Sequence, residues 1–215
     1  MHQALQVNEL FTSIQGESRF AGLPCFFIRL MGCPLRCVWC DNEYAFFEGK
    51  NYTIEQLLEE SKKSGCHLVE VTGGEPLAQK ETIDLLKALL SSGFTVLLET
   101  SGALPLKNVP QEIIKIVDLK CPGSGMAERN LWKNFSLLQP HDEIKCVISD
   151  REDYLWAKAE LEARNLLGHA SVIFSPVNQK LNPTTLANWI LEDRLPVKIQ
   201  IQLHKFLWPK KERGF

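Results

Sequence analysis

Short apolar runs rich in β-branched residues alternate with segments of helical periodicity along most of the chain. The predicted strands cover residues 25–30, 68–72, 94–99, 115–119, 143–148, 170–174 and 197–203. The predicted helices cover residues 53–63, 81–91, 131–138, 150–167 and 183–192. This alternation is typical of a parallel sheet with crossover helices. Six or seven strands are too few to close an eight-stranded barrel, so the sequence predicts an α/β fold, a partial, open (β/α) barrel of mostly parallel strands.

Glycine and polar residues follow the predicted strands at the same end. The segments GCPLRC, GGEP, TSG, KCPGSG and SPV come directly after strands, whereas the opposite connections, such as LSSG and RNLLGH, are less distinctive. Ligands of open α/β sheets bind beyond the carboxyl ends of the strands. The sequence therefore predicts that one face of the barrel carries the chemistry.

A cluster of three cysteines, Cys33, Cys37 and Cys40, lies on the loop after the first predicted strand. Structural zinc takes four protein ligands, and the chain has no second Cys-x2-Cys or His-x3–5-His pair. Cys121 or His204 could supply a fourth ligand from a distance. An iron–sulfur cluster on three thiolates would instead keep one iron open for a small molecule. We expect the remaining cysteines to be small buried hydrophobic residues: Cys25, Cys66, Cys121 and Cys146.

Composition argues against several classes of protein. The formal net charge of −2 implies no broad basic surface, so no direct contact with nucleic acid is expected. Apolar runs such as residues 25–30 are far too short to span a membrane, and the start MHQALQVNE does not have the pattern of a signal peptide. Seven cysteines, an odd number, are untypical of a secreted disulfide framework. We expect a cytoplasmic protein.

The cysteine spacing and the later motif Gly73-Gly74-Glu75-Pro76 together resemble the radical S-adenosylmethionine (SAM) enzymes. The resemblance implies a 4Fe–4S cluster held by the three cysteines, with the amine and carboxylate of SAM on the fourth iron. It implies that the reduced cluster cleaves SAM to a 5′-deoxyadenosyl radical, which abstracts hydrogen from a substrate. It also implies a flavodoxin- or ferredoxin-type reductant.

Longer segments narrow the resemblance. VNELFTSIQGES, LLETSG, DLKCPGSG, DEIKCVISD and IQLHKFLWP are similar to the 7-carboxy-7-deazaguanine synthase family, from about residue 5 to about residue 210. The family contracts 6-carboxy-5,6,7,8-tetrahydropterin to 7-carboxy-7-deazaguanine with loss of ammonia, for queuosine or related deazapurines, which points to tRNA modification. The resemblance implies a homodimer. It also implies one domain over residues 1–215, with residues 1–24 and 204–215 as barrel extensions.

The family resemblance also implies functional residues. Those for SAM are Gly73, Gly74, Glu75, Thr100, Ser101, Lys120 and Ser124. Those for the pterin are Gln15, Glu17, Arg29, Thr72, Gln202, His204 and Lys205. Arg29 also stands out on its own, because it interrupts an apolar strand and a guanidinium fork suits a carboxylate.

Two questions stay open in the sequence. Many relatives have a hydroxyl residue where this chain has Asn42, and that hydroxyl helps to bind Mg²⁺. The amide oxygen of Asn42 is also a hard ligand, so the sequence does not decide whether Mg²⁺ binds. Two other functions also remain: a radical SAM activating enzyme that makes a glycyl radical on a protein partner, and a zinc- or cluster-bearing binding module.

Overall fold

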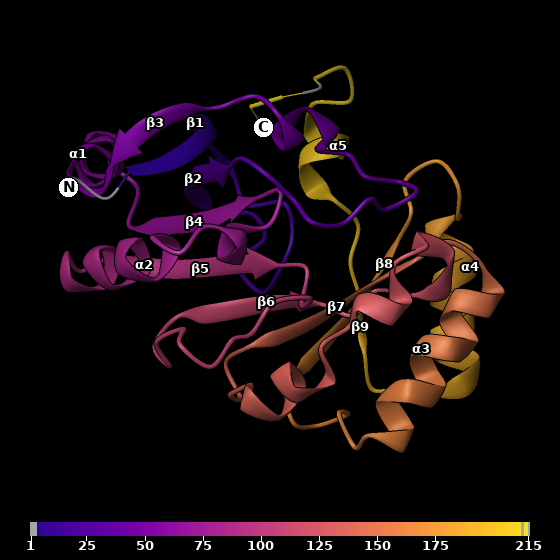
Figure 1. The fold of residues 1–215 in the computed structure, drawn as a ribbon. Helices are drawn as coiled ribbons and strands as arrows, with labels where there is room; N and C mark the ends of the chain where they lie inside the picture. Colours follow the sequence, from indigo (N-terminus) through magenta and orange to yellow (C-terminus); the bar gives the residue numbers. More distant parts are fainter. Residues whose placement is uncertain (1–3, 212, 215) are drawn as a thin grey trace.

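The structure is a computed structural model that describes residues 4–211 and 213–214. Within these residues a sheet of nine strands has the order β3-β1-β2-β4-β5-β6-β7-β8-β9 (Figure 1). The strands are β1 (Ala4–Ile14), β2 (Pro24–Leu30), β3 (Lys50–Thr53), β4 (Leu68–Gly73), β5 (Thr95–Thr100), β6 (Ile114–Asp118), β7 (Glu143–Ile148), β8 (Ser171–Pro176) and β9 (Lys198–Ile199). Strand β1 is antiparallel to β2 and β3, and the other pairs are parallel. Strands β3 and β9 are the two edges, so the barrel is open.

The described residues also form five α-helices and five short 3-10 helices. They are α1 (Ile54–Lys63), α2 (Thr82–Ser91), α3 (Arg151–Ala163), α4 (Pro183–Asp193) and α5 (Leu203–Leu207), with the 3-10 helices η1 (Glu43–Phe46), η2 (Pro76–Ala78), η3 (Pro122–Ser124), η4 (Ala127–Arg129) and η5 (Trp132–Leu137). In Figure 1, α1 and α2 flank the strands at one end of the sheet and α3 and α4 flank them at the other. Three of these helices begin at a side-chain N-cap, since Thr53, Asp150 and Asn182 each accept a backbone hydrogen bond from the first turn of a helix.

The partial, open α/β barrel is confirmed, but the expected number of six to seven strands is wrong. Residues 4–14 form β1, which pairs on both sides and also brings in the short β3. The predicted strand 197–203 is also wrong in extent, because β9 has only two residues and α5 begins at Leu203. The predicted helix 131–138 is the 3-10 helix η5.

The inside of the barrel is apolar at one end and charged at the other. Outward-facing strand residues such as Val69 and Val71 belong to the main core shared with α1–α4. Inward-facing residues first form a smaller apolar cluster, which we call the barrel plug: Cys25, Phe27, Leu68, Leu97 and Ile116. Further along the same strands the inward positions are polar or charged. Because successive residues of a strand face opposite sides, this layering places an aqueous site above an apolar floor.

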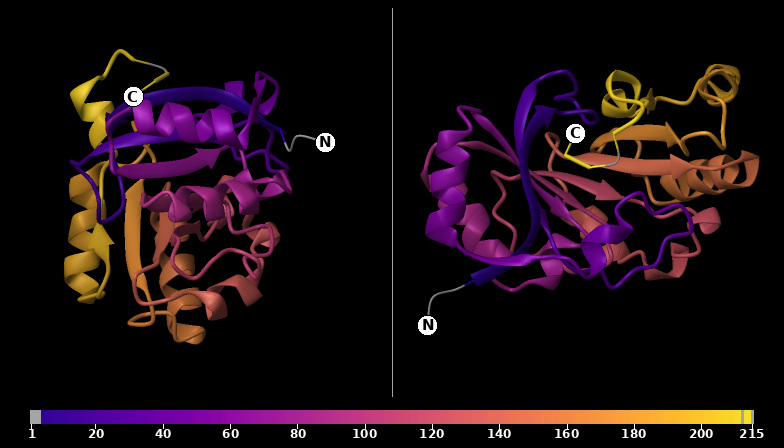
Figure 2. Two further views of the ribbon diagram at one scale, coloured as in Figure 1. Left: turned by 90° about the vertical axis from the view of Figure 1, so that its left-hand side faces the viewer. Right: turned by 90° about the horizontal axis from the view of Figure 1, so that it is seen from above.

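The C-terminal segment lies beside the cysteine loop. The Leu203 N–H at the start of α5 donates to the Gly16 carbonyl, 3.0 Å away, and Lys205 Nζ donates to Asp41 Oδ2 at 2.8 Å. Both views of Figure 2 show the yellow C-terminal segment against the purple N-terminal third of the chain. Of the two predicted barrel extensions, residues 1–3, 212 and 215 lie outside the described residues.

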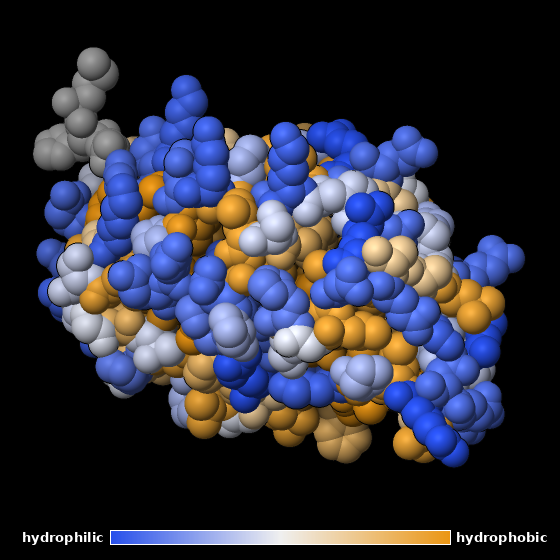
Figure 3. All heavy atoms as spheres, turned by 90° about the horizontal axis from the view of Figure 1, so that it is seen from below, coloured by the Kyte–Doolittle hydropathy of each residue, from blue (hydrophilic) through white to orange (hydrophobic). Residues whose placement is uncertain are grey.

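The outer surface mixes apolar and polar residues. Exposed large apolar side chains occur at separated positions, for example Phe47, Leu155 and Leu191. The face seen from below carries hydrophobic residues interspersed with hydrophilic ones (Figure 3). No helix in the described ranges is both long enough and apolar enough to cross a membrane.

Asn134 on η5 holds the loop that follows β5. Its Nδ2 donates to the carbonyls of Gly102 and Leu104, at 2.9 and 2.8 Å, and its Oδ1 accepts from Leu106 N–H at 3.0 Å. We expect Asn134→Ala to lower the free energy of unfolding by about 2–4 kcal/mol, because three buried backbone groups lose their partner. Urea unfolding measures this, with exposed Asn51→Ala as the control. Equal midpoints for the two variants would contradict the role of Asn134.

Candidate active site

The carboxyl ends of β2, β4, β5 and β6 surround a cavity of about 400 Å³, called here the cofactor cavity. Its lining includes the three clustered cysteines and five of the residues predicted for SAM: Gly73, Gly74, Thr100, Ser101 and Lys120. Four consecutive strands of the sheet therefore deliver the sequence motifs to one place. Glu75 and Ser124 do not line this cavity, and their assigned contacts with SAM stay predictions.

The Gly-Gly turn after β4 packs directly on the start of the cysteine loop. Gly74 N–H donates to the Leu30 carbonyl at 3.1 Å, and Glu75 N–H donates to the Gly32 carbonyl at 2.7 Å. A Cβ on Gly74 would collide with the Gly32 carbonyl oxygen and approach Cys33. A residue without a side chain is therefore required for the two loops to meet.

Glu75 has a structural position behind the cofactor cavity. Its fully buried carboxylate accepts hydrogen bonds from Thr100 Oγ1 at 2.8 and 2.9 Å, and from the N–H and Oγ of Ser101 at 2.7 and 2.5 Å. It also accepts from Leu77 N–H at 2.9 Å. The carboxylate thus joins the loop after β4 to the loop after β5 and orients Ser101.

Ser124 is likewise buried away from the cofactor cavity. Its Oγ donates to the Cys121 carbonyl at 2.6 Å and accepts from Met126 N–H at 3.1 Å. Its carbonyl accepts from Val38 N–H at 3.1 Å, within the cysteine loop. The described contacts of Ser124 therefore hold that loop in place.

The three thiols have the chemistry that an iron–sulfur cluster requires. Burial raises the pKa of each thiol, while Lys120 opposes the shift at Cys33 and Cys37. Bound iron would stabilise the thiolates that the free site disfavours. In the described part of the chain, no three His, Cys, Asp or Glu side chains converge on one metal-ion position. A cluster fits this arrangement, because each thiolate binds a different iron.

The fourth protein ligand that zinc would need does not reach the cysteine loop. Cys121 is 1% exposed and its Sγ faces the Leu119 carbonyl at 3.8 Å. His204 lines a different cavity, described below. The zinc-binding module considered from the sequence is therefore not supported.

Asp118, which the sequence reasoning did not single out, offers a free acceptor in the cofactor cavity. Its Oδ2 accepts from Lys120 Nζ at 2.5 Å, whereas its buried Oδ1 has no hydrogen-bond partner among the described residues. A buried acceptor without a partner is unfavourable. An amine or hydroxyl group of a bound ligand would donate to Asp118 Oδ1. The polar groups of this cavity therefore fit a cofactor such as SAM.

A second cavity of about 640 Å³, the substrate cavity, adjoins the first. Small-molecule sites typically have this size. All seven residues predicted for the pterin line it: Gln15, Glu17, Arg29, Thr72, Gln202, His204 and Lys205. Thr72, Glu99 and Lys145 line both cavities, so a ligand in one lies against a ligand in the other.

Arg29 presents its guanidinium to the substrate cavity. Its Nε donates to Glu9 Oε1 at 2.7 Å, and Tyr44 Oη donates to the same oxygen at 3.0 Å. The Arg29 guanidinium also lies 5.6 Å from the centre of the Phe11 ring. These contacts fix the side chain through one nitrogen. Within the described residues the two terminal nitrogens form no hydrogen bond or ion pair with another side chain, so they remain for a ligand carboxylate, which a guanidinium binds best in a forked geometry.

Lys145 is the central charge between the cavities, and the sequence reasoning missed it together with Glu99. Its Nζ donates to Glu17 Oε2 and to Glu99 Oε1, both at 2.7 Å. Burial alone would lower the pKa of Lys145, but the two carboxylates raise it well above its usual value. Lys145 in turn holds the pKa of Glu99 at about 2 against the effect of burial. A charged residue inside an apolar strand, the signal that identified Arg29, is also present in EIKC and LLET.

His204 rests on the turn of the IQGES segment. A Cβ on Gly16 would overlap the His204 imidazole, so only glycine permits this packing. Burial, and then the neighbouring Lys205, lower the pKa of His204 to about 4. The imidazole is therefore neutral at neutral pH. Gln202 and Lys205 on either side both bind Asp41 Oδ2, at 3.3 and 2.8 Å.

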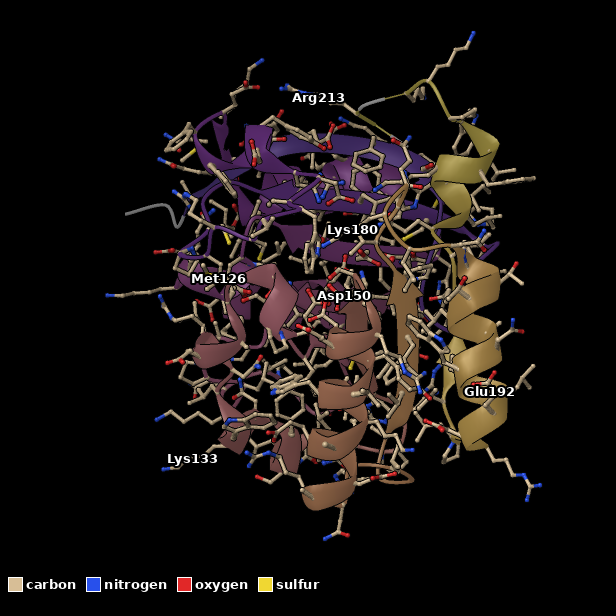
Figure 4. All side chains as sticks on the ribbon, turned by 90° about the vertical axis from the view of Figure 1, so that its right-hand side faces the viewer. Met126, Lys133, Asp150, Lys180, Glu192 and Arg213 are labelled. Carbon is tan, nitrogen blue, oxygen red and sulfur yellow. The ribbon has the colours of Figure 1, made fainter. Side chains whose placement is uncertain are left out.

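Asn42 and the C-terminal tail close the outer part of the substrate cavity. Asn42 Oδ1 lies 3.1 Å from Tyr44 Oη and its Nδ2 donates to Asp41 Oδ1 at 2.9 Å. Arg213, near the top of Figure 4, donates to Glu48 Oε2 at 2.7 Å and lies 4.1 Å from the Tyr44 ring centre. The C-terminal tail therefore lines the mouth of the cavity.

The loop after β8 also contacts the cysteine loop. Lys180 Nζ lies 5.1 Å from the centre of the Trp39 ring and 4.0 Å from Asp150 Oδ2. Figure 4 shows Lys180 and Asp150 side by side. The rim of the cofactor cavity is thereby tied to the start of α3.

The fold and the cysteine loop define a radical SAM enzyme. The family model of the radical SAM superfamily matches residues 28–121. A 7-carboxy-7-deazaguanine synthase of Koribacter versatilis is 45% identical over 98% of this chain and 100% of the relative. One of Chlorobaculum tepidum is 46% identical over 98% of this chain and 97% of the relative. The chain belongs to the 7-carboxy-7-deazaguanine synthase family.

Solved structures agree on the fold. The crystal structure of QueE from Escherichia coli has a TM-score of 0.76 at 22% identity, covering 94% of this chain and 96% of that chain. The structure of Streptococcus suis SuiB bound to S-adenosylmethionine has a TM-score of 0.54 at 14% identity, covering 83% of this chain and 48% of that chain. At these identities the likeness concerns the fold alone.

Replacement of Cys33, Cys37 or Cys40 by Ala should abolish both cluster assembly and SAM cleavage. Each thiolate would hold a different iron, so none can substitute for another. Iron and sulfide analysis after anaerobic reconstitution measures the first, and 5′-deoxyadenosine formation the second. Cys66→Ala is the control, since the half-buried Cys66 packs on the main core and lines neither cavity. A Cys37→Ala protein that kept its cluster and SAM cleavage would overturn the assignment.

The neutral His204 should make the folded protein sensitive to acid. The unfolded chain binds a proton at the usual histidine pKa of 6.5, whereas the folded protein binds it only near 4. The free energy of unfolding should therefore fall as the pH drops from about 6.5 to about 4, by on the order of 3 kcal/mol. Urea unfolding at several pH values should show a smaller fall in His204→Gln, whereas His169→Gln, at an exposed position, should behave like the wild type.

Proposed function

We propose that this protein contracts 6-carboxy-5,6,7,8-tetrahydropterin to 7-carboxy-7-deazaguanine with release of ammonia, as a radical SAM lyase. The observation that carries the proposal is the pair of adjoining cavities. One gathers three cysteines and the Gly-Gly turn, and the other presents Arg29 and His204. Membership of the synthase family supports the same reaction.

The residues of the cofactor cavity have distinct parts in the proposal. Cys33, Cys37 and Cys40 would hold the 4Fe–4S cluster, and the turn at Gly73 and Gly74 lets the backbone approach SAM closely. Donors and acceptors from the neighbouring strand ends complete the site: Thr100, Ser101, Asp118 and Lys120. When bound, the cluster and SAM supply a radical that removes a hydrogen atom from the substrate.

The residues of the substrate cavity orient the pterin against the cofactor. Arg29 binds the substrate carboxylate, and neutral His204 contributes a hydrogen bond without adding charge. Gln15 and Glu17 lie at the pterin ring, and Thr72 lies on the boundary between the cavities. Helix α5, which includes Lys205 and is preceded by Gln202, keeps water out. Holding both reactants in fixed geometry is a large part of what such a site does for the rate.

Magnesium is the part of the family prediction that these residues support least. Asn42 has a single carbonyl oxygen, which lies beside the Tyr44 hydroxyl, and its amide nitrogen donates to Asp41. Mg²⁺ requires near-ideal octahedral oxygen ligation. The residues around Asn42 do not form such a site, and no step of the proposed reaction depends on it.

The wider setting follows from the same family membership. We propose a cytoplasmic homodimer of a single radical SAM domain that receives electrons from a flavodoxin- or ferredoxin-type protein. Its product would enter queuosine synthesis and thus tRNA modification. The free thiols of all seven cysteines within the described residues support a reducing compartment. The alternative, an enzyme that makes a glycyl radical on a protein, gains no support from a cavity built around Arg29 and His204.

Anaerobic reconstitution tests the reaction directly. The protein with its cluster is incubated with SAM, a strong reductant and carboxytetrahydropterin, and carboxydeazaguanine and ammonia are measured. Both products should appear, and each should depend on SAM. An intact cluster that cleaves SAM without forming carboxydeazaguanine would refute the proposed function.

Arg29→Ala should separate substrate recognition from SAM chemistry. Loss of the charge-assisted fork should lower kcat/KM for the pterin by roughly 100-fold or more. Cluster content and SAM binding should remain, because Arg29 does not line the cofactor cavity. Arg29→Lys keeps the charge and loses the forked geometry, so its kcat/KM for the pterin should lie between those of the wild type and Arg29→Ala. Unchanged pterin turnover in Arg29→Ala would exclude this role.

A further inference from the structure

Glu70 is a buried carboxyl group that the proposed function leaves unused. It lies in the middle of β4, is 3% exposed and lines the substrate cavity. Its register partners are Phe27 on β2 and Leu97 on β5, two members of the barrel plug. Glu70 therefore places one carboxyl at the apolar floor of the cavity, a costly position unless something pairs with it.

The described partners of Glu70 include no cation. Gln15 Nε2 donates to Glu70 Oε2, and Gln15 Oε1 accepts from Glu17 N–H at 2.9 Å, which fixes the orientation of the amide. In contrast, both Glu17 and Glu99 are paired with Lys145. Of the three carboxylates Glu17, Glu70 and Glu99, Glu70 alone has no ion pair with a lysine or arginine among the described residues.

The charges that face Glu70 come from four directions: Glu99 on β5, Glu17 after β1, Lys145 on β7 and Arg29 on β2. Burial first, and then the Glu99 and Glu17 carboxylates, raise the pKa of Glu70 well above its usual value. Glu70 is therefore protonated more easily than an exposed glutamate, and additional hydrogen-bond donors would stabilise its carboxylate form.

The depth of Glu70 matches the far end of a pterin. Arg29 is level with Thr72 across β2 and β4, and Glu70 lies two residues deeper on β4, roughly 6.6 Å along the strand. A carboxypterin with its carboxylate at Arg29 directs its opposite edge toward this floor. That edge carries the exocyclic 2-amino group and the ring N3–H side by side, two donors that fit the two-pronged geometry of one carboxylate.

We propose that Glu70 is the specificity-determining residue for the 2-amino-4-oxo edge of the substrate. Its carboxylate accepts from both N–H groups of that edge, and Gln15 holds the carboxylate in place. The assignment deepens the proposed function and rests on it. It gives this part of the recognition to Glu70 rather than to Glu17, whose carboxylate is committed to Lys145.

Glu70→Gln tests the assignment with almost no change in shape. The carboxamide oxygen can accept from N3–H, but the carboxamide NH2 is a donor and cannot accept from the 2-amino group of a pterin. The same NH2 can donate to the 2-oxo group of a lumazine. We would measure the dissociation constants of 6-carboxypterin and 6-carboxylumazine from the fluorescence of each ligand, using reconstituted protein with SAM. The measurement is made at a pH at which the lumazine ring is neutral. The wild type should favour the pterin by on the order of 10- to 100-fold, and Glu70→Gln should lose or reverse that preference.

Two outcomes would overturn the assignment. One is a wild type that binds both ligands equally well, a result that needs no variant. The other is a folded Glu70→Gln protein that keeps the wild-type preference for the pterin; loss of that preference in Glu17→Gln would then assign the edge to Glu17. A wild type that binds neither ligand would count against the proposed function itself, so the two failures are distinguishable. Thermal unfolding and iron content of each variant confirm that the comparison is made on intact protein.

Discussion

The buried ammonium of Lys145 is the interaction on which the arrangement of the site depends. It lies where the two cavities meet and bonds to carboxylates from two other parts of the chain, Glu17 after β1 and Glu99 on β5. A buried ion pair stabilises a fold little in net terms, but removal of one partner leaves an uncompensated charge, at a cost of roughly 3–5 kcal/mol. Lys145 therefore requires its two carboxylates to be in place, and this couples the N-terminal turn to the far strands.

The layering of the barrel strengthens the interactions of Lys145 and its carboxylates. The barrel plug supplies a dry floor, and polar side chains occupy the next inward positions toward the carboxyl ends. In such surroundings, charges interact more strongly than in water. The same low polarity makes Glu70 an acceptor that is costly to leave unpaired. A polar ligand placed above the plug is thus recognised by few but strong contacts.

Loop contacts at the rim depend on glycine and on one carboxylate. Gly74 permits the turn after β4 to touch the cysteine loop, and Gly16 permits His204 to lie on the N-terminal turn. Glu75 then ties two strand ends together by accepting hydrogen bonds from Thr100 and Ser101. The GGEP segment therefore has a packing role in this structure. This explains why Glu75, named from the motif, lies behind the cavity that it helps to shape.

The amino-acid sequence by itself determined the parallel α/β barrel and the face that carries the motifs, because apolar periodicity and strand-end glycines are local signals. It also located the cysteine loop and Arg29, since spacing and a charge within an apolar run are visible in one dimension. The sequence did not predict strand β1 and helix α5, because their structure depends on partners distant in the chain. Only the tertiary structure decided that Lys145, Glu99 and Glu70 meet inside the barrel. Each of them lies on a different strand, and only the closing sheet brings them close enough to interact.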